Sequence, residues 1–327
     1  MIPSRIRVVG LVAAAAIVAG ACTSSGATAS PTAAPTATPV VTTGPAVTAA
    51  PTPTPAPTPT PAPTQVITGS VPADQLVVTG RLTICSDIPY PPQEFFDAQG
   101  NPTGSDIDIG NEIANRLGLK YAVQNTVYDT IIAALAGEKC DIIISAQNIT
   151  QEKLKQVDMI PFFHAGQSFV VAKGNPDGVK TVQDLCGKSV GVENGTTEAD
   201  HLNGTGDYKP ADGLNAQCLA AGKAKIDVQP FTKDSDALLA LQSDKVAVYF
   251  TDSPVAGYYV VQQPDMFDLV PNLVLSDINE GISVSKDKPA LESAVKTALQ
   301  SMMDDGTYLQ ILKKYGVESG AVTSTNP

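Results

Sequence analysis

The hydrophobic positions after residue 75 alternate between a strand-like and a helix-like period. The run CDIII at 140–144 is apolar apart from Asp141, as in a strand that is buried on both faces of a sheet. Ile109, Ile113 and Leu117 recur at helical spacing, and Gly118 follows at a position that often ends a helix. In this half of the chain the pattern predicts strands within 76–85, 119–127 and 140–144, and helices at 105–117 and 128–136.

The same alternation continues in the second half. Strands are expected at 168–173, within 188–200, at 225–231 and at 246–252, and helices at 236–244, 253–263 and 289–303. Because strands and helices alternate, we expect an α/β fold with mostly parallel sheets and helices on the sheet faces. Three helix starts are predicted from cap residues: Ser105 with Asp108 as a capping box, Thr150, and Ser253 followed by proline.

The N-terminal segment does not fit this pattern. Two arginines precede an apolar run at 8–19, which is too short to span a bilayer and suits the core of a signal peptide. The letters VAGAC end at Cys22 and are similar to a bacterial lipobox, so residues 1–22 are expected to be a lipoprotein signal peptide with Cys22 as the lipidation site. A buried cysteine in an ordinary signal peptide is the alternative. Residues 23–73 are rich in Thr, Ala and Pro and carry no charge, which predicts a disordered, semi-rigid stalk.

Composition narrows the function classes. The chain has 327 residues, of which 33 are acidic and 21 basic, for a formal net charge of −12. A net acidic chain without a basic patch argues against nucleic acid as the main partner. The segment from residue 74 to about 320 is long enough for two lobes of ordinary domain size.

Seven segments of this folded part, in their order along the chain, resemble the bacterial extracellular solute-binding proteins of family 3, the polar amino acid class that feeds ABC importers. They are YPPQEF, GSDIDIGNEIANRLGL, YDTIIAALAGEKCDIIIS, NITQEKLKQVD, DLCGKSVGVENGTTEAD, YFTDSP and DGTYLQILKKYG. The resemblance implies a two-lobed, type II periplasmic-binding-protein fold with two hinge strands and a ligand in the cleft. It places the first lobe at 74–165 plus 279–320 and the second at 166–278, with hinges near 164–167 and 276–280.

Lys153 is the candidate partner for a ligand carboxylate. It lies in the first turn of a helix that follows a strand end, where free N–H groups and the helix dipole favour an anion. The resemblance implies that this position, usually arginine, clamps the α-carboxylate of the ligand; lysine makes a point-charge contact instead of a fork. The backbone N–H groups of Thr196 and Thr197 are expected to reach the same carboxylate. A surface lysine and an ordinary glycine turn are the alternatives.

Asp252 is the candidate partner for a ligand ammonium group, as the resemblance implies, with helix capping as its alternative role. The side-chain carbonyl of Asn148 and the backbone carbonyl of Ala146 are further expected acceptors. The resemblance also implies that Tyr90 and Tyr128 sandwich the ligand's side chain, with core packing as the alternative; Asp87 could face a positive or amide group on that side chain. Four polar departures from the family pattern leave the identity of the ligand open: Gln93, Ser105, Asn148 and Lys153.

Four cysteines remain beyond Cys22, and an even number in an exported chain indicates disulfides. With the lobes that the resemblance implies, pairing within each lobe leaves the hinge free, and we therefore predict Cys85–Cys140 and Cys186–Cys218. A zinc site is the alternative, although no C-x₂-C pair exists. His164 and His201 have no partner at ligand or triad spacing, so neither metal nor cofactor is expected.

These observations favour a binding protein over an enzyme. The expected protein is a monomer, lipid-anchored to the outer face of the cell membrane, which captures a small zwitterion such as a polar amino acid and delivers it to the permease subunits of an ABC importer. A cleft enzyme of the cyclohexadienyl dehydratase type is one alternative, but it needs a dedicated general acid or base, and the sequence shows none. A ligand-sensing receptor subunit is the other.

Overall fold

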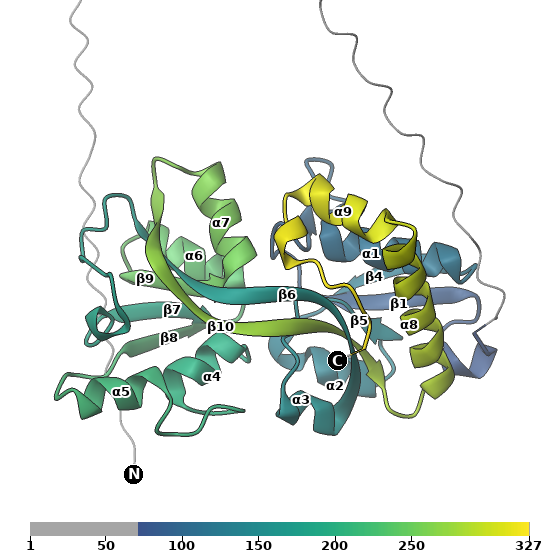
Figure 1. Cartoon of the computed structure of the whole chain (residues 1–327), viewed down its shortest axis with the longest axis horizontal. Helices are drawn as coiled ribbons and strands as arrows, with labels where there is room; N and C mark the ends of the chain where they lie inside the picture. Colours follow the sequence, from purple (N-terminus) through teal and green to yellow (C-terminus); the bar gives the residue numbers. More distant parts are fainter. Residues whose placement is uncertain (1–70, 327) are drawn as a thin grey trace, which may run out of the picture. The chain divides into compact units, whose positions relative to one another are not determined.

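The computed structural model describes residues 71–326 (Figure 1). The predicted signal peptide at 1–22, the lipidation site Cys22 and residues 23–70 of the predicted stalk lie outside the described residues. Within 71–326, no helix is both long enough and apolar enough to cross a membrane. Val71, the first described residue, is 8% exposed and packs in the hydrophobic core, so folded structure begins within the last three residues assigned to the stalk.

The main sheet has eight strands in the order β4-β1-β5-β10-β6-β9-β7-β8. Its strands are β1 (Arg81–Ser86), β4 (Lys120–Asn125), β5 (Ile142–Ile143), β6 (Val157–Ala172), β7 (Ser189–Glu193), β8 (Asp227–Phe231), β9 (Val248–Asp252) and β10 (Phe267–Ser285). The trio β4-β1-β5 is parallel, and so is the trio β9-β7-β8. Between them β6 and β10 pair antiparallel along most of their length, and Figure 1 shows them running from one trio to the other. The short strands β2 (Phe95–Phe96) and β3 (Pro102–Thr103) form a separate ladder.

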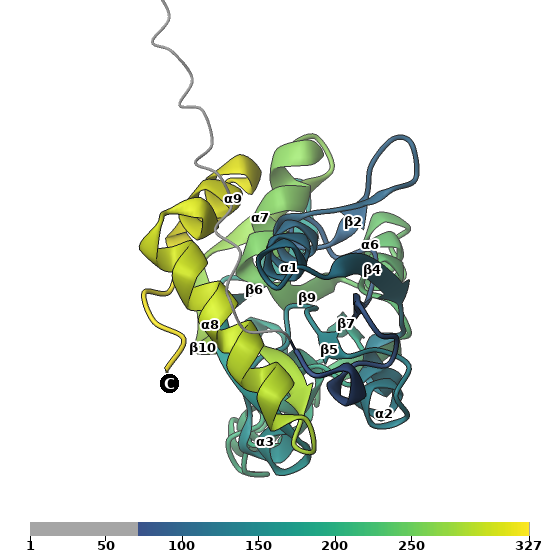
Figure 2. The same ribbon diagram turned by 90° about the vertical axis from the view of Figure 1, so that its right-hand side faces the viewer.

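Nine α-helices accompany the sheet within the described residues. They are α1 (Ser105–Arg116), α2 (Ile131–Ala136), α3 (Gln151–Gln156), α4 (Thr197–Asn203), α5 (Leu214–Ala220), α6 (Asp234–Gln242), α7 (Ser253–Gln262), α8 (Pro289–Asp304) and α9 (Thr307–Tyr315). Short 3₁₀ turns are η1 (Ala73–Gln75), η2 (Tyr128–Thr130), η3 (Val182–Asp184) and η4 (Glu318–Gly320). The C-terminal helices α8 and α9 return to the first trio, where both pack against α1 (Figure 2).

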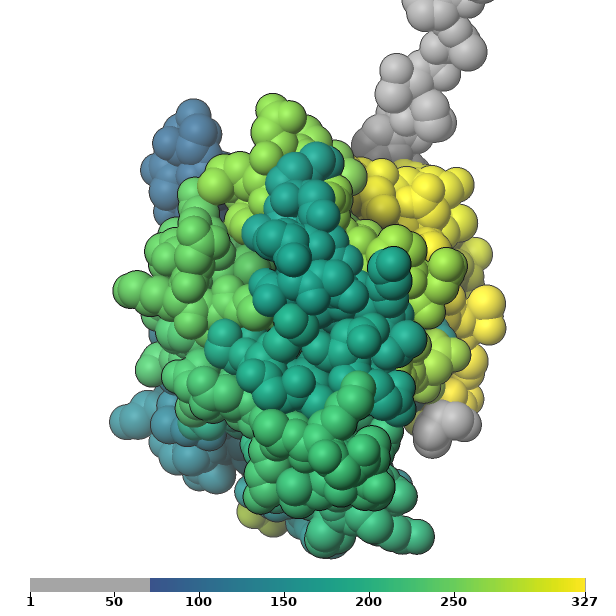
Figure 3. All heavy atoms as spheres, turned by 90° about the vertical axis from the view of Figure 1, so that its left-hand side faces the viewer, coloured from purple at the N-terminus to yellow at the C-terminus, as the bar shows by residue number. Residues whose placement is uncertain are grey.

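Separate apolar cores define two lobes. The larger core joins residues of β1, α1, β5 and α8, among them Ile84, Ile113 and Leu299, all at most 1% exposed. The second lobe is packed around β7 and β9, where the rings of Phe169 and Phe250 stack 4.1 Å apart. Figure 3 looks onto this second lobe, whose teal and green atoms make up most of the visible face. The two-lobed α/β fold is therefore confirmed, while the residue limits of the lobes stay a prediction.

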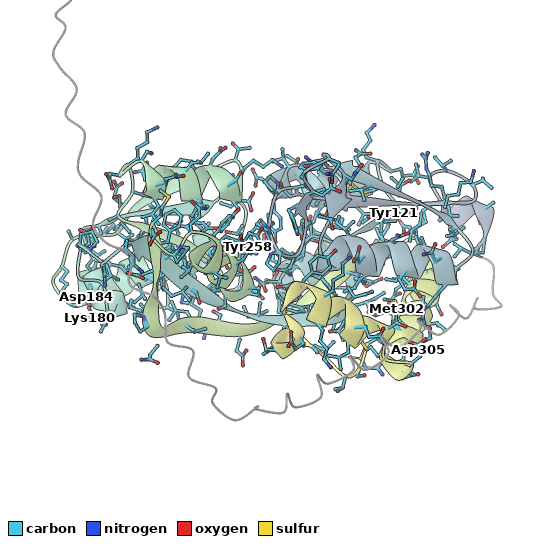
Figure 4. The ribbon with its side chains drawn as sticks, turned by 90° about the horizontal axis from the view of Figure 1, so that it is seen from above. Tyr121, Lys180, Asp184, Tyr258, Met302 and Asp305 are labelled. Atoms are coloured by element: carbon cyan, nitrogen blue, oxygen red, sulfur yellow. A yellow bond between two sulfur atoms is a disulfide. The ribbon has the colours of Figure 1, made fainter. Side chains whose placement is uncertain are left out.

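One buried cation fastens the C-terminal helices to the first lobe. Arg116, at the end of α1, is 1% exposed, and its guanidinium pairs with Asp305 at 2.7 Å. The same group donates to the Ser301 hydroxyl at 2.7 Å. Figure 4 labels Asp305 at the end of α8, so this contact ties α1 to a helix nearly two hundred residues away in sequence.

Both disulfides follow the predicted pairing. Cys85 at the end of β1 bonds to Cys140 just before β5, and Cys186 bonds to Cys218 in α5. Each bond joins segments of one lobe, so neither crosses between the lobes.

Two predicted helix caps are wrong by one residue. Gly104, not Ser105, is the N-cap of α1, and no side-chain cap bond forms there. The first N–H groups of α1 donate instead to the carbonyls of Pro92 and Gln93, and a Cβ on Gly104 would lie 2.1 Å from the Gln93 oxygen. The tight approach of the proline-rich loop therefore sets the helix start. Likewise α7 has Asp252 as its N-cap, with Pro254 in its first turn.

Candidate functional site

A pocket of about 290 Å³ lies where the strands of both parallel trios end. Such carboxyl edges are where α/β sheets present ligands. The lining residues are Asp87, Tyr90, Glu94, Tyr128, Ser145, Ala146, Asn148, Glu193, Thr196, Glu198 and Asp252. Asp87 follows β1, Ser145 follows β5, and Glu193 and Asp252 end β7 and β9.

Seven of the nine predicted ligand-binding residues line this pocket. The other two, Lys153 and Thr197, lie directly behind the lining. Lys153 Nζ donates to the Tyr128 hydroxyl at 3.2 Å and to the backbone carbonyl of Asn148 at 3.0 Å. The Thr197 hydroxyl accepts a hydrogen bond from the Asn148 amide at 2.8 Å. The structure thus gathers residues that are far apart in sequence, while their roles toward a ligand remain proposals.

Three unpartnered oxygens stand together at one part of the pocket. They are Asn148 Oδ1, Glu198 Oε1 and Asp252 Oδ1, none of which accepts a hydrogen bond from an N–H group or a hydroxyl. All three residues are 3% exposed. Leaving a buried acceptor unpaired costs free energy, and a group that brings N–H donors removes that cost. This arrangement therefore suits an ammonium group or another nitrogen cation.

The Asp252 side chain is not a helix cap, although the residue occupies the N-cap position of α7. Its Oδ2 accepts a hydrogen bond from the Tyr90 hydroxyl at 2.8 Å instead. Burial raises the pKa of Asp252 above its ordinary value, with hydrogen bonds opposing the shift. Burial and the neighbouring Asp252 charge raise the pKa of Glu198 well above that of an exposed glutamate. The Glu198 and Asp252 side chains also share a hydrogen bond, in which the protonated Glu198 carboxyl is the donor.

A second acidic group of the pocket consists of Asp87 and Glu193. The Asp87 carboxylate accepts a hydrogen bond from the Tyr128 backbone N–H and pairs with Lys233, which precedes α6 in the second lobe. Glu193 accepts from the backbone N–H of Asp234 at 3.2 Å. Burial, followed by the charges of Asp234 and Asp87, raises the pKa of Glu193 to about 10.

Lys153 is half-buried and lies in the first turn of α3. The Thr150 hydroxyl caps α3 by accepting from the Lys153 backbone N–H at 3.1 Å. Burial lowers the pKa of the ammonium group to about 8, while the carboxylates of Glu198 and Asp252 act in the opposite direction. Its ring contact is Tyr128, whose centroid is 5.6 Å from Nζ.

Several contacts cross from one lobe to the other around the pocket. Besides the Tyr90–Asp252 and Asn148–Thr197 bonds, the Asn194 amide donates to Asp129 at 2.8 Å. A Cβ on Gly195 would lie 2.8 Å from the Asp129 carboxylate, so the lobes approach too closely there for a side chain. Elsewhere between the lobes, the ring of Tyr258, labelled in Figure 4, lies 6.1 Å from that of Phe95.

The sequence interpretation missed four charged residues of this site: Glu94, Glu193, Glu198 and Lys233. Glu193 and Glu198 flank the NGTT turn that was singled out, so their place at a strand end and in a first helical turn was the available signal. Despite the number of carboxylates, no group of three or more His, Cys, Asp or Glu residues in 71–326 has an arrangement that could hold a metal ion.

Comparisons with known proteins identify similar sequences and similar folds. The family model of the bacterial extracellular solute-binding proteins, family 3, matches residues 82–318. The lysine/arginine/ornithine-binding periplasmic protein of Escherichia coli (strain K12) is 30% identical over 240 residues, which cover 71% of this chain and 86% of that protein. The structure of an ancestral arginine-binding protein bound to glutamine is 35% identical, with a TM-score of 0.64, and the match covers 73% of this chain and 99% of that one. An ancestral amino acid-binding protein, a precursor of cyclohexadienyl dehydratase, is 31% identical with a TM-score of 0.60 and coverages of 72% and 95%.

Proposed function

This chain belongs to family 3 of the bacterial extracellular solute-binding proteins, and on that premise we propose that it is the extracytoplasmic binding component of an ABC importer for a small amino-bearing solute of the polar amino acid class. The observation that carries the proposal is the set of unpartnered acceptors on Asn148, Glu198 and Asp252. Because Asn148 comes from one lobe and the other two from the second, a bound ammonium group would join the lobes. A ligand that contacts both lobes favours the closed arrangement by its differential affinity.

In this binding mode Asp252, with Asn148 and Ala146, receives the ammonium group, and Tyr90 and Tyr128 flank the rest of the solute. An amino acid would direct its carboxylate toward Lys153 and the N–H groups of Thr196 and Thr197. Asp87 would face a polar or positive side chain. The names of the relatives, which refer to arginine, lysine and ornithine, support this class of solute.

The ligand class can be tested by thermal unfolding of the purified protein in the presence of amino acids and amines. A true ligand at a hundred times its dissociation constant should raise the free energy of unfolding by about 2.7 kcal/mol, since only the folded state binds it. Simple sugars and dicarboxylates serve as controls and should leave the unfolding temperature unchanged. If no amino-bearing solute stabilises the protein, the proposed function is wrong.

A dehydratase activity is the second candidate because a precursor of such an enzyme is among the similar structures and Glu193 and Glu198 have raised pKa values. A carboxyl group that keeps its proton near neutral pH could act as a general acid. Incubation with prephenate or arogenate distinguishes the candidates: a binding protein forms no product, whereas steady turnover would establish the enzyme.

We further propose that Cys22 carries a lipid and that residues 23–70 tether a monomeric binding protein to the outer face of the cell membrane, near the permease subunits. The expected result is a mature chain that begins at Cys22 with a diacylglyceryl modification. Mass spectrometry of protein extracted from membranes checks this directly. A Cys22→Ala variant, which should be released into the medium, is the control; an unmodified N-terminus at another residue would contradict the anchor.

A further inference from the structure

Lys233 brings a cation of the second lobe to the end of the pocket that Asp87 lines. It is the N-cap residue of α6, but its side chain makes no cap bond. Lysine is a poor N-cap residue, and its charge opposes the partial positive charge at a helix start. Local structure therefore gives no reason for a lysine at this position. The side chain instead crosses to the first lobe, where it pairs with Asp87.

The ammonium group of Lys233 is surrounded by oxygens of the first lobe. Besides the Asp87 carboxylate, the backbone carbonyl oxygen of Ile88 lies 3.4 Å from Nζ, and the side-chain oxygen of Asn125 lies 3.5 Å from it. Three acceptors match the three N–H donors of an ammonium group. The Lys233 side chain is 23% exposed and that of Asp87 is 5% exposed, so water and salt screen this ion pair only in part.

Both oxygens of the Asp87 carboxylate are engaged by the protein itself. One pairs with Lys233, and the other accepts a hydrogen bond from the Tyr128 backbone N–H. Glu193, the other acidic residue at this end of the pocket, has a pKa of about 10, chiefly because it is buried, so its carboxyl group is uncharged at neutral pH. A solute that reaches this end therefore meets an ion pair and a neutral carboxyl group instead of an unpaired negative charge.

A solute with a cationic side chain would have to compete with Lys233 for Asp87. If Lys233 stayed in place, two like charges would lie close together beside a single carboxylate. If Lys233 were displaced, its partly buried ammonium group would lose its charged partner. An uncharged side chain meets neither cost, because it leaves the ion pair intact.

We propose that Lys233 takes the place of a cationic solute side chain at Asp87, and that the solute is therefore an amino acid whose side chain is uncharged. Lys233 is then a specificity-determining residue, which separates this chain from a relative whose name refers to lysine, arginine and ornithine. The amino group of the solute would still lie toward Asp252. The inference rests on the proposed function, because it names the class of solute for the same site.

Calorimetry with matched pairs of amino acids tests the inference on the full-length protein. The pairs are citrulline with arginine and glutamine with ornithine; the members of a pair have side chains of similar length and differ mainly in charge. The uncharged member of at least one pair is expected to bind at least tenfold more tightly than its cationic counterpart. Equal affinities within both pairs, or tighter binding of the cationic members, would overturn the proposal.

A charge variant isolates the role of Lys233. Lys233→Met keeps an unbranched side chain but removes its charge and frees Asp87, so the ratio of uncharged to cationic solute affinity should fall by at least tenfold. Lys233→Arg returns the cation and should restore the discrimination. Lys173→Met is the matched control, since Lys173 pairs with Asp268 at 2.9 Å outside the pocket lining, and it should leave the ratio unchanged.

The affinity ratio also distinguishes specificity from a merely structural role. A lysine that only held the lobes together would change both affinities of a pair by the same factor, so an unchanged ratio in Lys233→Met would contradict the inference. If Lys233→Met does not fold, the wild-type panel alone decides. If arginine or ornithine is the tightest solute, the inference is wrong while the proposed function stands. If no amino-bearing solute binds at all, both fall together.

Discussion

Replacing Cys85 and Cys140 together by alanine is expected to lower the free energy of unfolding by about 4 kcal/mol. The bond closes a loop between residues separated by 55 positions, and in the chain-entropy model a loop of this length restricts the unfolded chain by about that amount. Both cysteines are also buried, at 0% and 2% exposure, beside Ile143 and Leu135, so the lost sulfur contacts add to the effect. Urea unfolding of the two proteins, followed by circular dichroism, measures the difference.

The second disulfide provides the internal comparison for that experiment. Cys186 and Cys218 are separated by 32 positions, and their removal should cost about 3.5 kcal/mol, slightly less because the loop is shorter. Since each bond lies within one lobe, neither change should alter which solute binds. A loss below about 1 kcal/mol for both double variants would show that the bonds add little beyond the packed lobes.

Asp252→Asn is expected to weaken solute binding by about one to two decades. A hydrogen bond to a charged group contributes about 1.5–3 kcal/mol, and each 1.4 kcal/mol corresponds to a tenfold change in affinity. The amide also presents donors toward a cation that itself carries only donors. Calorimetry with the best solute of the thermal screen measures the loss.

The matched control for Asp252→Asn is Asp265→Asn, which makes the same chemical change at an exposed turn after α7. This control should bind as well as the wild type. Unchanged affinity in Asp252→Asn would mean that the carboxylate does not contact the solute and that the ammonium site lies elsewhere in the pocket.

Local patterns were sufficient for the features that depend on local geometry. Thr150 caps α3 as predicted, because the hydroxyl and the N–H of Lys153 are three residues apart. The cap of α1 could not be predicted in this way, since Pro92 and Gln93 determine it through a tertiary approach. The strand β6 was predicted only from residue 168, yet it begins at Val157, because its first half is held by pairing with β10 more than a hundred residues away.

The site residues likewise divide into those that the sequence identified and those that only the folded structure brings together. The family resemblance placed Asp87, Asn148 and Asp252 in one ligand cleft, and the structure brings these residues together in one pocket. Glu193 and Glu198 have ordinary roles when they are considered singly, at a strand end and in a first helical turn. Only the folded chain reveals that they converge with Asp252 and Asp87 on one small volume.

Because the pKa values of the pocket carboxyl groups are raised, binding of the proposed solute would be coupled to the release of protons. At neutral pH Glu193, with a pKa of about 10, keeps its proton until a cation arrives, and Glu198 is displaced in the same direction. Since a bound cation would favour the ionised carboxylates, entry of the proposed amino-bearing solute would release protons into the surrounding medium, and its affinity would fall as that medium becomes more acidic. Protons would then compete with the solute for the site, so a cell that acidifies its medium would weaken solute binding by this protein.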